Sequence, residues 1–273
     1  MKRRARSEGE ISLVGWRVEF LQDLSKLDLQ PAAVAANAVA AAKGKAGHLQ
    51  HRSRHADTYL LPLRTRTGEI DIYVKVYQPP AGLNRLKSRW RGGRANNAIR
   101  MSTALRRDGF AVPALLLAGH HSATRRTMLV AMRAQGVALP ELLRSGPNAA
   151  SGWLERKRRI LRELGAMVAR LHAKGYVHGD LTPYNVFVVA GERPSFVLLD
   201  HDRTRMAFPL GRQRRQLRNL VQLARFNFAG ITESDRLRVF SSYAACLDRR
   251  RYRSMLRQTA RMLAARRRKG RQA

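Results

Sequence analysis

Residues 177–189 read VHGDLTPYNVFVV, two apolar stretches separated by polar side chains. Asp180 and Asn185 stand between the stretches, five positions apart. Asp200 comes fifteen positions after Asn185, at the end of the apolar run in FVLLDHDRTR (196–205). Apolar runs of this length, flanked by turn residues, predict a β-hairpin. A hairpin of this length would return Asp200 to the edge of the structure where Asn185 lies.

These side chains suit the transfer of a phosphoryl group from a nucleotide. Such a reaction needs a metal ion, a cation on the phosphates and an acid that orients the attacking hydroxyl. Asp180 is the candidate base, and Asn185 and Asp200 are candidate oxygen ligands of Mg²⁺. His178 is expected to support the loop, since Asp180 already supplies the base. Lys75, in the strand-like run IYVKVY, would need an anionic partner if it faced inward, and phosphate oxygens would serve.

The order of the other patterns indicates the fold class. The sequence predicts a hairpin at 57–78, a helix at 94–109, strands at 112–121 and 127–134, a short helix at 138–145, an amphipathic helix at 151–174 and a helical, basic segment at 203–273. We therefore expect an α+β fold of two lobes, with a small β-rich N-terminal lobe and a helical C-terminal lobe.

The chain is expected to divide into four segments. These are a variable N-terminal lead-in at 1–50, the N-terminal lobe at 51–132, the C-terminal lobe at 133–248 and a basic amphipathic tail at 249–273. Within the lead-in, KGKAGH (43–48) could wrap phosphates, or it could be a flexible linker.

Charge is the unusual feature of the composition. The chain has 53 Lys and Arg against 19 Asp and Glu, a net charge of +34, and nine of the cations are Lys. Arg favours planar contact with phosphate or carboxylate, so nucleic acid, nucleotide or an anionic lipid surface are candidate partners. A bias toward Arg with solvated charges would give the same composition. The apolar stripe of the helix at 249–270 could lie on an anionic membrane or pack on the C-terminal lobe.

The sequence predicts a cytoplasmic protein that is soluble or peripheral to a membrane. Its one cysteine, Cys246, fits a reducing compartment. Glu8 and Glu10 interrupt the basic N-terminus before a signal-peptide core could form. The Ala-rich run at 31–42 is too short to span a bilayer.

The motifs also resemble a known family. HGDLTPYNV resembles the catalytic loop of protein kinases, with Gly179 in place of Arg, and LLDHD resembles their metal-binding element. Together with the VKVY strand and RRDGFAVP (106–113), they resemble the bacterial lipopolysaccharide core kinases, which phosphorylate Kdo or heptose. The resemblance covers residues 57 to 225. It implies a bilobal protein-kinase-like fold, ATP and Mg²⁺ as cofactors, and a sugar hydroxyl of a lipid-linked glycan as acceptor at the inner face of the inner membrane.

The resemblance assigns roles to particular positions. Asp180 would be the catalytic base, and Asn185 and Asp200 the metal ligands. The phosphate-binding lysine would be Lys75. The hinge whose backbone meets adenine would be formed by Met132, Ala134 and Gln135.

One departure from the kinase pattern leaves other functions open. Kinases pair the strand lysine with a Glu on the next helix, but this chain has no acidic residue between Asp71 and Asp108, and Ala98 stands at the aligned position. A pseudokinase, binding nucleotide or serving as a scaffold at the membrane, is therefore one alternative. An RNA-linked atypical kinase of the RIO type is another, motivated by the net charge, although only 7% of the residues are aromatic.

Overall fold

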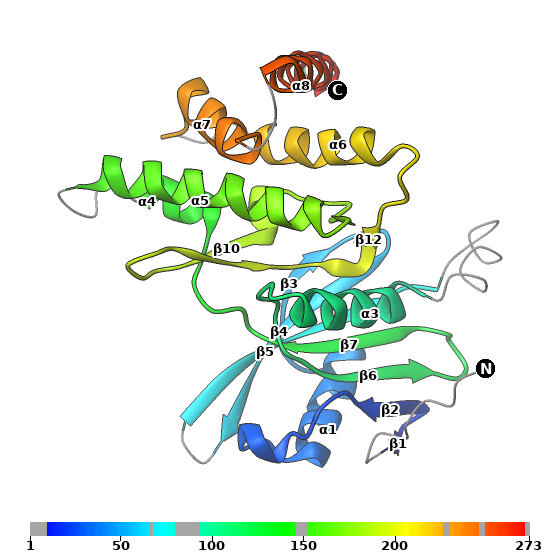
Figure 1. Cartoon of the computed structure of the whole chain (residues 1–273). Coiled ribbons are helices and arrows are strands. Elements are labelled where there is room, and N and C mark those ends of the chain that lie inside the picture. The colour runs from blue at the N-terminus through cyan, green and yellow to red at the C-terminus, as the bar shows by residue number, and fades with distance from the viewer. Residues whose placement is uncertain are drawn as a thin grey trace. The chain divides into compact units, whose positions relative to one another are not determined.

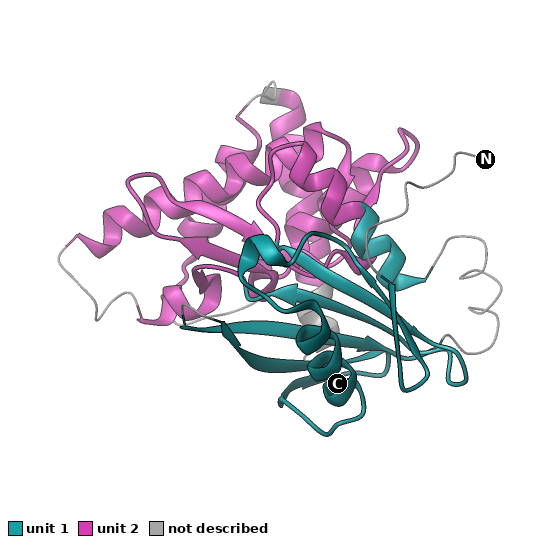
Figure 2. Cartoon of the chain, turned by 90° about the horizontal axis from the view of Figure 1, so that it is seen from below, with its two compact units in different colours: residues 1–100, 113–133 teal, residues 101–112, 134–273 magenta. Residues whose placement is uncertain are grey.

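The computed structural model describes residues 10–65, 68–79, 93–145, 152–225, 230–245 and 249–270. The chain divides into two compact units, which Figure 2 distinguishes by colour. Unit 1 contains residues 1–100 and 113–133, and unit 2 contains residues 101–112 and 134–273.

Unit 1 is built on a seven-stranded antiparallel sheet (Figure 1). In spatial order its strands are β1 (Glu10–Leu13), β2 (Trp16–Phe20), β6 (Leu115–His121), β7 (Thr127–Met132), β5 (Gly68–Tyr77), β4 (Ala56–Thr65) and β3 (His48–Arg52). The hairpin predicted at 57–78 is confirmed, because β4 and β5 pair along their whole length. The two strands predicted at 112–121 and 127–134 are β6 and β7, which also pair.

The two faces of this sheet are covered differently. Helix α1 (Pro31–Ala42) packs on the face that carries Ile72, Val74 and Val76, each fully buried in the main core of unit 1. The alternate side chains of β5 point to the other face, where Tyr77 joins a smaller apolar cluster with Ala98 of helix α3 (Arg94–Arg107). Lys75 alternates with these core residues and lies on the Tyr77 side of the strand.

The N-terminal segment corrects the expectation of a separate lead-in at 1–50. From Glu10 onward it supplies β1, β2, α1 and β3 to unit 1, and Trp16 and Val18 are buried in its core. The alternation in WRVEF covers only five residues, which is too short to predict a strand without its neighbours. The KGKAGH stretch is the turn that ends α1, where Gly44 takes the left-handed conformation (φ 70°).

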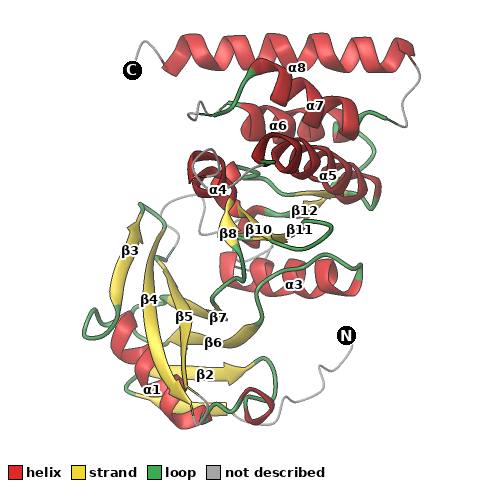
Figure 3. Ribbon diagram, turned by 90° about the vertical axis from the view of Figure 1, so that its left-hand side faces the viewer, coloured by secondary structure: helices red, strands yellow, loops and turns green. Residues whose placement is uncertain are grey.

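Unit 2 combines helices with two small sheets (Figure 3). Its helices are the second half of α3, α4 (Leu139–Ser145), α5 (Trp153–Ala173), α6 (Arg212–Ala224), α7 (Glu233–Tyr243) and α8 (Arg249–Gly270), with short 3₁₀ helices η3 (Pro183–Asn185) and η4 (His201–Arg203). Strands β11 (Ser195–Leu198), β10 (Val186–Val189) and β8 (Val137–Ala138) form one sheet, and β12 (Arg205–Met206) pairs with β9 (Tyr176–Val177). A further 3₁₀ helix, η1 (Ser25–Leu27), lies in unit 1.

Helix α5 forms the centre of unit 2. Its apolar face, predicted from the sequence, is buried, and its N-cap is Gly152. Ser151, the first residue of the predicted helix, lies outside the described residues. Helix α7 packs directly against it at Gly165, where an added Cβ would lie 2.3 Å from the Val239 carbonyl. The buried Lys157 ammonium donates to the Asp235 carboxylate at 2.8 Å and so ties α5 to the first turn of α7.

Helix α8 packs against α6, so the apolar stripe of the tail belongs to the fold (Figure 3). Met255 and Thr259 are buried, and Tyr252, Leu256 and Met262 are half-buried against the same core. This favours packing over membrane contact for that stripe. Among the helices of the described ranges, none is both long enough and apolar enough to cross a bilayer.

Candidate active site

The predicted hairpin brings Asn185 and Asp200 to the same end of one small sheet. Strands β10 and β11 pair from Val186 opposite Leu198. One step beyond that pair, the Leu199 amide donates to the Asn185 carbonyl at 3.0 Å. Asn185 and the residue before Asp200 are therefore directly bonded through the backbone.

The loop before the hairpin holds Asp180 against Asn185. The Asn185 side-chain amide donates to the Asp180 carbonyl oxygen at 2.9 Å, and the Thr182 amide donates to the same oxygen at 2.8 Å. Because its nitrogen is used in this way, Asn185 can offer its Oδ1 to a cation. The structure thus brings together the three residues of unit 2 that were predicted for the base and the metal.

His178 supports this loop, as predicted. Its side chain is completely buried, its Nε2 donates to the Leu199 carbonyl at 2.8 Å, and its carbonyl accepts from the Thr204 hydroxyl at 3.1 Å. Burial lowers the pKa of His178, so the ring is neutral at neutral pH. The neutral ring ties the segment before Asp180 to the segment before Asp200.

Two amide side chains of α6 also hold the loop, and sequence reasoning missed both. Gln222 accepts from the Leu181 amide at 3.2 Å and donates to the Gly179 carbonyl at 3.1 Å, on either side of Asp180. The Asp180 Oδ1 lies 3.4 Å from the same Gln222 nitrogen. Asn219, which is 1% exposed, accepts from the His178 amide at 3.0 Å. The role of Asn219 could have been suspected from the sequence, because this polar residue stands close to Leu217 and Leu220, which are apolar and buried.

Gly179, which departs from the Arg of protein kinases, is required by its surroundings. Its φ is +79°, a conformation that favours glycine. A Cβ built there would lie 2.4 Å from the Arg203 carbonyl oxygen. The close approach of these two backbone segments leaves no room for a side chain.

The donor set at the hairpin fits Mg²⁺ brought by a nucleotide. Asn185 and Asp200 offer amide and carboxylate oxygens, which Mg²⁺ prefers, and phosphates usually complete its shell. Within the described ranges, no three His, Cys, Asp or Glu residues form a metal-binding group. Asp200 takes a left-handed backbone conformation (φ 59°, ψ 67°), and strain of this kind concentrates at functional sites.

Lys75 lies in unit 1, half-buried on β5. Its ammonium nitrogen is 5.3 Å from the centroid of the Tyr77 ring, within the range of a cation–π interaction. Ala98 is 4% exposed and belongs to the same apolar cluster as Tyr77. The position expected for the helix Glu is therefore filled by a small apolar side chain.

The three residues predicted to form the hinge differ in their surroundings. The Met132 amide donates to the Ala114 carbonyl at 2.8 Å within unit 1, so its N–H already has a partner. In unit 2, Ala134 is buried and Gln135 is exposed. The chain that follows is fixed by Gly136, where a Cβ would lie 2.4 Å from the carbonyl oxygen of Val188 on β10.

Comparison with known proteins identifies the family. Residues 83–243, more than half of the chain, match the family described as "Lipopolysaccharide kinase (Kdo/WaaP) family". The chain belongs to this lipopolysaccharide kinase family. It is therefore a kinase, as the catalytic-loop motif predicted, and ATP is its expected phosphate donor.

Comparison with solved structures found similar chains. The chain is similar to WaaP in complex with acyl carrier protein, with 20% identity, a TM-score of 0.59, and coverage of 94% of this chain and 98% of that one. It is also similar to WbdD, with 19% identity, a TM-score of 0.46, and coverage of 80% of this chain and 50% of that one. No curated sequence matches the chain. The WaaP likeness confirms the predicted bilobal, kinase-like α+β fold.

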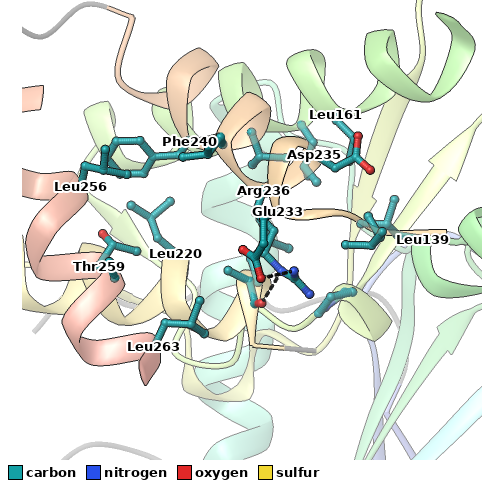
Figure 4. A pocket seen from close by; sticks show the side chains of 18 of the residues that line it. Leu139, Leu161, Leu220, Glu233, Asp235, Arg236, Phe240, Leu256, Thr259 and Leu263 are labelled. Atoms are coloured by element: carbon teal, nitrogen blue, oxygen red, sulfur yellow. Dashed lines mark hydrogen bonds and ion pairs between the residues drawn. The ribbon is translucent and has the colours of Figure 1, made fainter. Parts of the chain in front are cut away.

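Unit 2 also contains a mostly apolar cavity, whose lining includes Glu233, Asp235 and Arg236 (Figure 4). Its volume is about 160 Å³, and it is lined by side chains of α4 to α8. Leu161, Leu220 and Leu256 are among them, together with Phe240 of α7. A cavity of this size with a mostly apolar lining suits a small apolar group.

Proposed function

We propose that this kinase transfers the γ-phosphate of ATP to a sugar hydroxyl of the lipopolysaccharide core or of a related envelope glycolipid. The observation that carries the proposal is the bonded arrangement of Asp180, Asn185 and the residue before Asp200 at one end of the β10–β11 hairpin. The family and the resemblance to kinases of Kdo and heptose support the acceptor class.

Each residue has a chemical role in this proposal. Asp180 accepts the proton of the sugar hydroxyl as the hydroxyl oxygen bonds to the γ-phosphorus. The bond from that phosphorus to the bridging oxygen breaks, and ADP leaves with the electron pair. Mg²⁺, when bound with the nucleotide, would neutralise phosphate charge, and Asn185 and Asp200 would hold it. Lys75 would bind the non-transferred phosphates.

We assign the nucleotide base to the segment Met132–Gln135. Ala134 and Gln135 would contact adenine through the backbone. Since the Met132 amide is engaged in the sheet, Met132 would contribute through its carbonyl or its side chain. Peripheral association with the inner face of the inner membrane would give the enzyme access to a lipid-linked acceptor, and the net charge of +34 supports it.

The test is phosphate transfer to a defined acceptor. Purified protein with Mg-ATP and lipid-linked core oligosaccharide should give a glycan heavier by one phosphate. Asp180→Asn should lower kcat by about 10²- to 10⁴-fold, the usual contribution of a general base. Glu192→Gln, an exposed carboxylate on the turn after β10, is the matched control and should retain activity.

The competing functions give different results. Nucleotide binding without transfer to any core glycolipid would identify a pseudokinase. Salt-sensitive retention of RNA with transfer to an RNA-associated protein would support the RIO-like alternative. If ATP with Mg²⁺ neither raises the thermal stability nor is hydrolysed, the assignment of the nucleotide site is wrong.

We also propose that the apolar cavity of unit 2 receives an acyl chain presented by an acyl carrier protein. The similar WaaP structure was solved in complex with such a carrier, and the lining of the cavity suits a hydrocarbon. The acyl-loaded carrier should bind at least about tenfold more tightly than the unloaded carrier.

A filling substitution tests the cavity directly. Ala260→Phe adds bulk at the cavity wall on α8, whereas Ala264→Phe lies one turn further on and does not line it. Only the first should weaken binding of the loaded carrier. Equal binding of the loaded and unloaded carriers would contradict the proposal.

A further inference from the structure

The segment Met206–Leu210 exposes an unusual group of apolar side chains. Met206 is 51% exposed, Phe208 78% and Leu210 92%. Single exposed apolar residues are common on protein surfaces. Phe208 and Leu210, however, are the two most exposed large apolar side chains of the described residues, and all three stand at alternate positions in one short segment.

This segment is held at both ends, so the exposure belongs to the fold. Before it, β12 pairs with β9, and the Ala207 amide donates to the Gly175 carbonyl at 2.8 Å. After it, the Arg212 guanidinium donates to the carbonyls of His172 and Ala173 at 2.6 and 3.1 Å, which fixes the start of α6 to the end of α5. The apolar side chains therefore project from an anchored loop.

Positive charge surrounds the loop. From Arg203 to Arg218 the sequence has six arginines and no carboxylate, and the next acidic residue is Glu233. A groove of about 640 Å³ lies between the loop with α6 and helix α8. Arg214 and Arg261 line it, together with apolar side chains of both helices.

We propose that Met206–Leu210 is a membrane-binding loop that inserts its apolar side chains into an anionic lipid surface. Protruding apolar side chains ringed by arginines are typical of interfacial membrane binding, where the apolar groups enter the acyl boundary and the cations meet the headgroups. A single-stranded nucleic acid would be bound through several stacking rings, and Phe208 is the one aromatic residue of the loop. The membrane therefore fits this surface better.

Membrane binding by the loop would also affect where the glycolipid acceptor lies. Arg205 begins β12 five residues after Asp200, in the same unit. If this loop binds the membrane, the sugars of a lipid-linked acceptor would lie near the chain segment that contains Asp200, a proposed metal ligand. This last step rests on the proposed function, whereas membrane binding by the loop does not.

The experiment compares vesicle binding by the full chain and two double variants. Vesicles contain phosphatidylcholine alone, or phosphatidylcholine partly replaced by phosphatidylglycerol, and bound protein is measured by co-sedimentation. We expect binding to the anionic vesicles only. Phe208→Ser with Leu210→Ser should weaken it at least about tenfold, and Arg214→Gln with Arg261→Gln should weaken it to a similar degree.

A matched control lies at the other end of α5. Leu154 is 54% exposed and Arg156 is exposed, and about 28 Å of helix separates Leu154 from Ala173 beside the loop. Leu154→Ser with Arg156→Gln removes one apolar group and one cation, and should leave vesicle binding unchanged. Equal loss in this control would mean that binding reflects overall charge, and would overturn the proposal.

A spectroscopic readout tests insertion itself. With lipids brominated on their acyl chains, the fluorescence of Phe208→Trp should be quenched relative to that of the unsubstituted protein, and that of Leu154→Trp should not. The proposal would be overturned if the protein did not bind vesicles, or if Phe208→Trp showed no added quenching. It would also be overturned if the serine variant still bound vesicles and RNA displaced it from them. Phosphate transfer to a detergent-dispersed acceptor is measured in parallel and should be unaffected by the serine substitutions. This assay tests the proposed kinase activity independently of membrane binding.

Discussion

The ammonium of Lys75 lies 5.3 Å from the centre of the Tyr77 ring, two residues along the same strand. Kinases usually place a helix Glu beside this lysine, but here the aligned Ala98 packs in the apolar cluster that contains Tyr77. The face of an aromatic ring is electron-rich and favours a nearby cation. The ring thus contributes to holding the ammonium, and Ala98 supplies no carboxylate from the helix.

Replacing the ring should weaken nucleotide binding. We expect Tyr77→Leu to raise the dissociation constant for Mg-ATP by about 2- to 5-fold, the usual worth of an exposed or partly exposed cation–π contact. Tyr77→Phe keeps the ring face and should bind like the unsubstituted protein. The constants can be measured by calorimetry, and equal weakening in both variants would show that the hydroxyl, and not the ring, matters.

Gly179 should not tolerate the arginine that protein kinases have. Gly179→Arg, and even Gly179→Ala, would force a Cβ against the Arg203 carbonyl in a left-handed backbone. We expect Gly179→Ala to lower the free energy of unfolding by at least about 3 kcal/mol, from steric overlap added to the backbone cost. Chemical denaturation measures the change.

Gly152 provides the control for Gly179. Its φ is +85°, but a Cβ there would have no neighbour within 4 Å. Gly152→Ala should lower the free energy of unfolding by only about 1–2 kcal/mol, the cost of a Cβ in a left-handed backbone. Equal losses at the two positions would show that the Arg203 carbonyl moves aside easily.

The buried His172 should make the protein sensitive to acid. Burial lowers the pKa of His172 from 6.5 to about 4, and its ring bonds Tyr243 and Asn219. Because folding favours the neutral ring, its contribution to stability is complete above pH 6.5 and is lost as the pH falls toward 4. The loss amounts to about 3 kcal/mol, and His178, whose pKa burial also lowers, acts in the same direction.

Thermal unfolding between pH 7 and pH 4 measures this loss. His172→Gln removes one titrating group and should flatten the pH dependence of the melting temperature, although it lowers stability at pH 7. His51→Gln, at an exposed histidine on β3, is the matched control. An unchanged slope in His172→Gln would contradict the assignment.

Gln222 should affect catalysis more than nucleotide binding. It bonds the backbone on both sides of Asp180, so Gln222→Leu should misplace the proposed base and lower kcat by about 10- to 100-fold. The nucleotide-induced rise in melting temperature should persist. Gln213→Leu, exposed on the same helix, is the control. Loss of nucleotide binding and of kcat together would indicate a general structural role.

The local part of the site could be predicted from residues that are close together in the chain. Asp180 and Asn185 are five residues apart on one turn, and two apolar runs flanked by turn residues predict the hairpin that follows, so short spacing predicted that the candidate base and metal ligands would lie together. The same reasoning predicted the strand of Lys75 and the buried face of α5. These features depend on residues that are near one another in the chain.

Which distant segments meet could not be predicted from local patterns. The bonds from α6 to the loop around Asp180, the carbonyl that makes Gly179 obligatory, and the place of residues 10–52 in the sheet all depend on contacts between residues far apart in sequence. An apolar stripe shows that one side of a helix will be covered, but not by what. For α8 the cover is unit 2 itself, and among the described residues the most exposed large apolar side chains are Phe208 and Leu210.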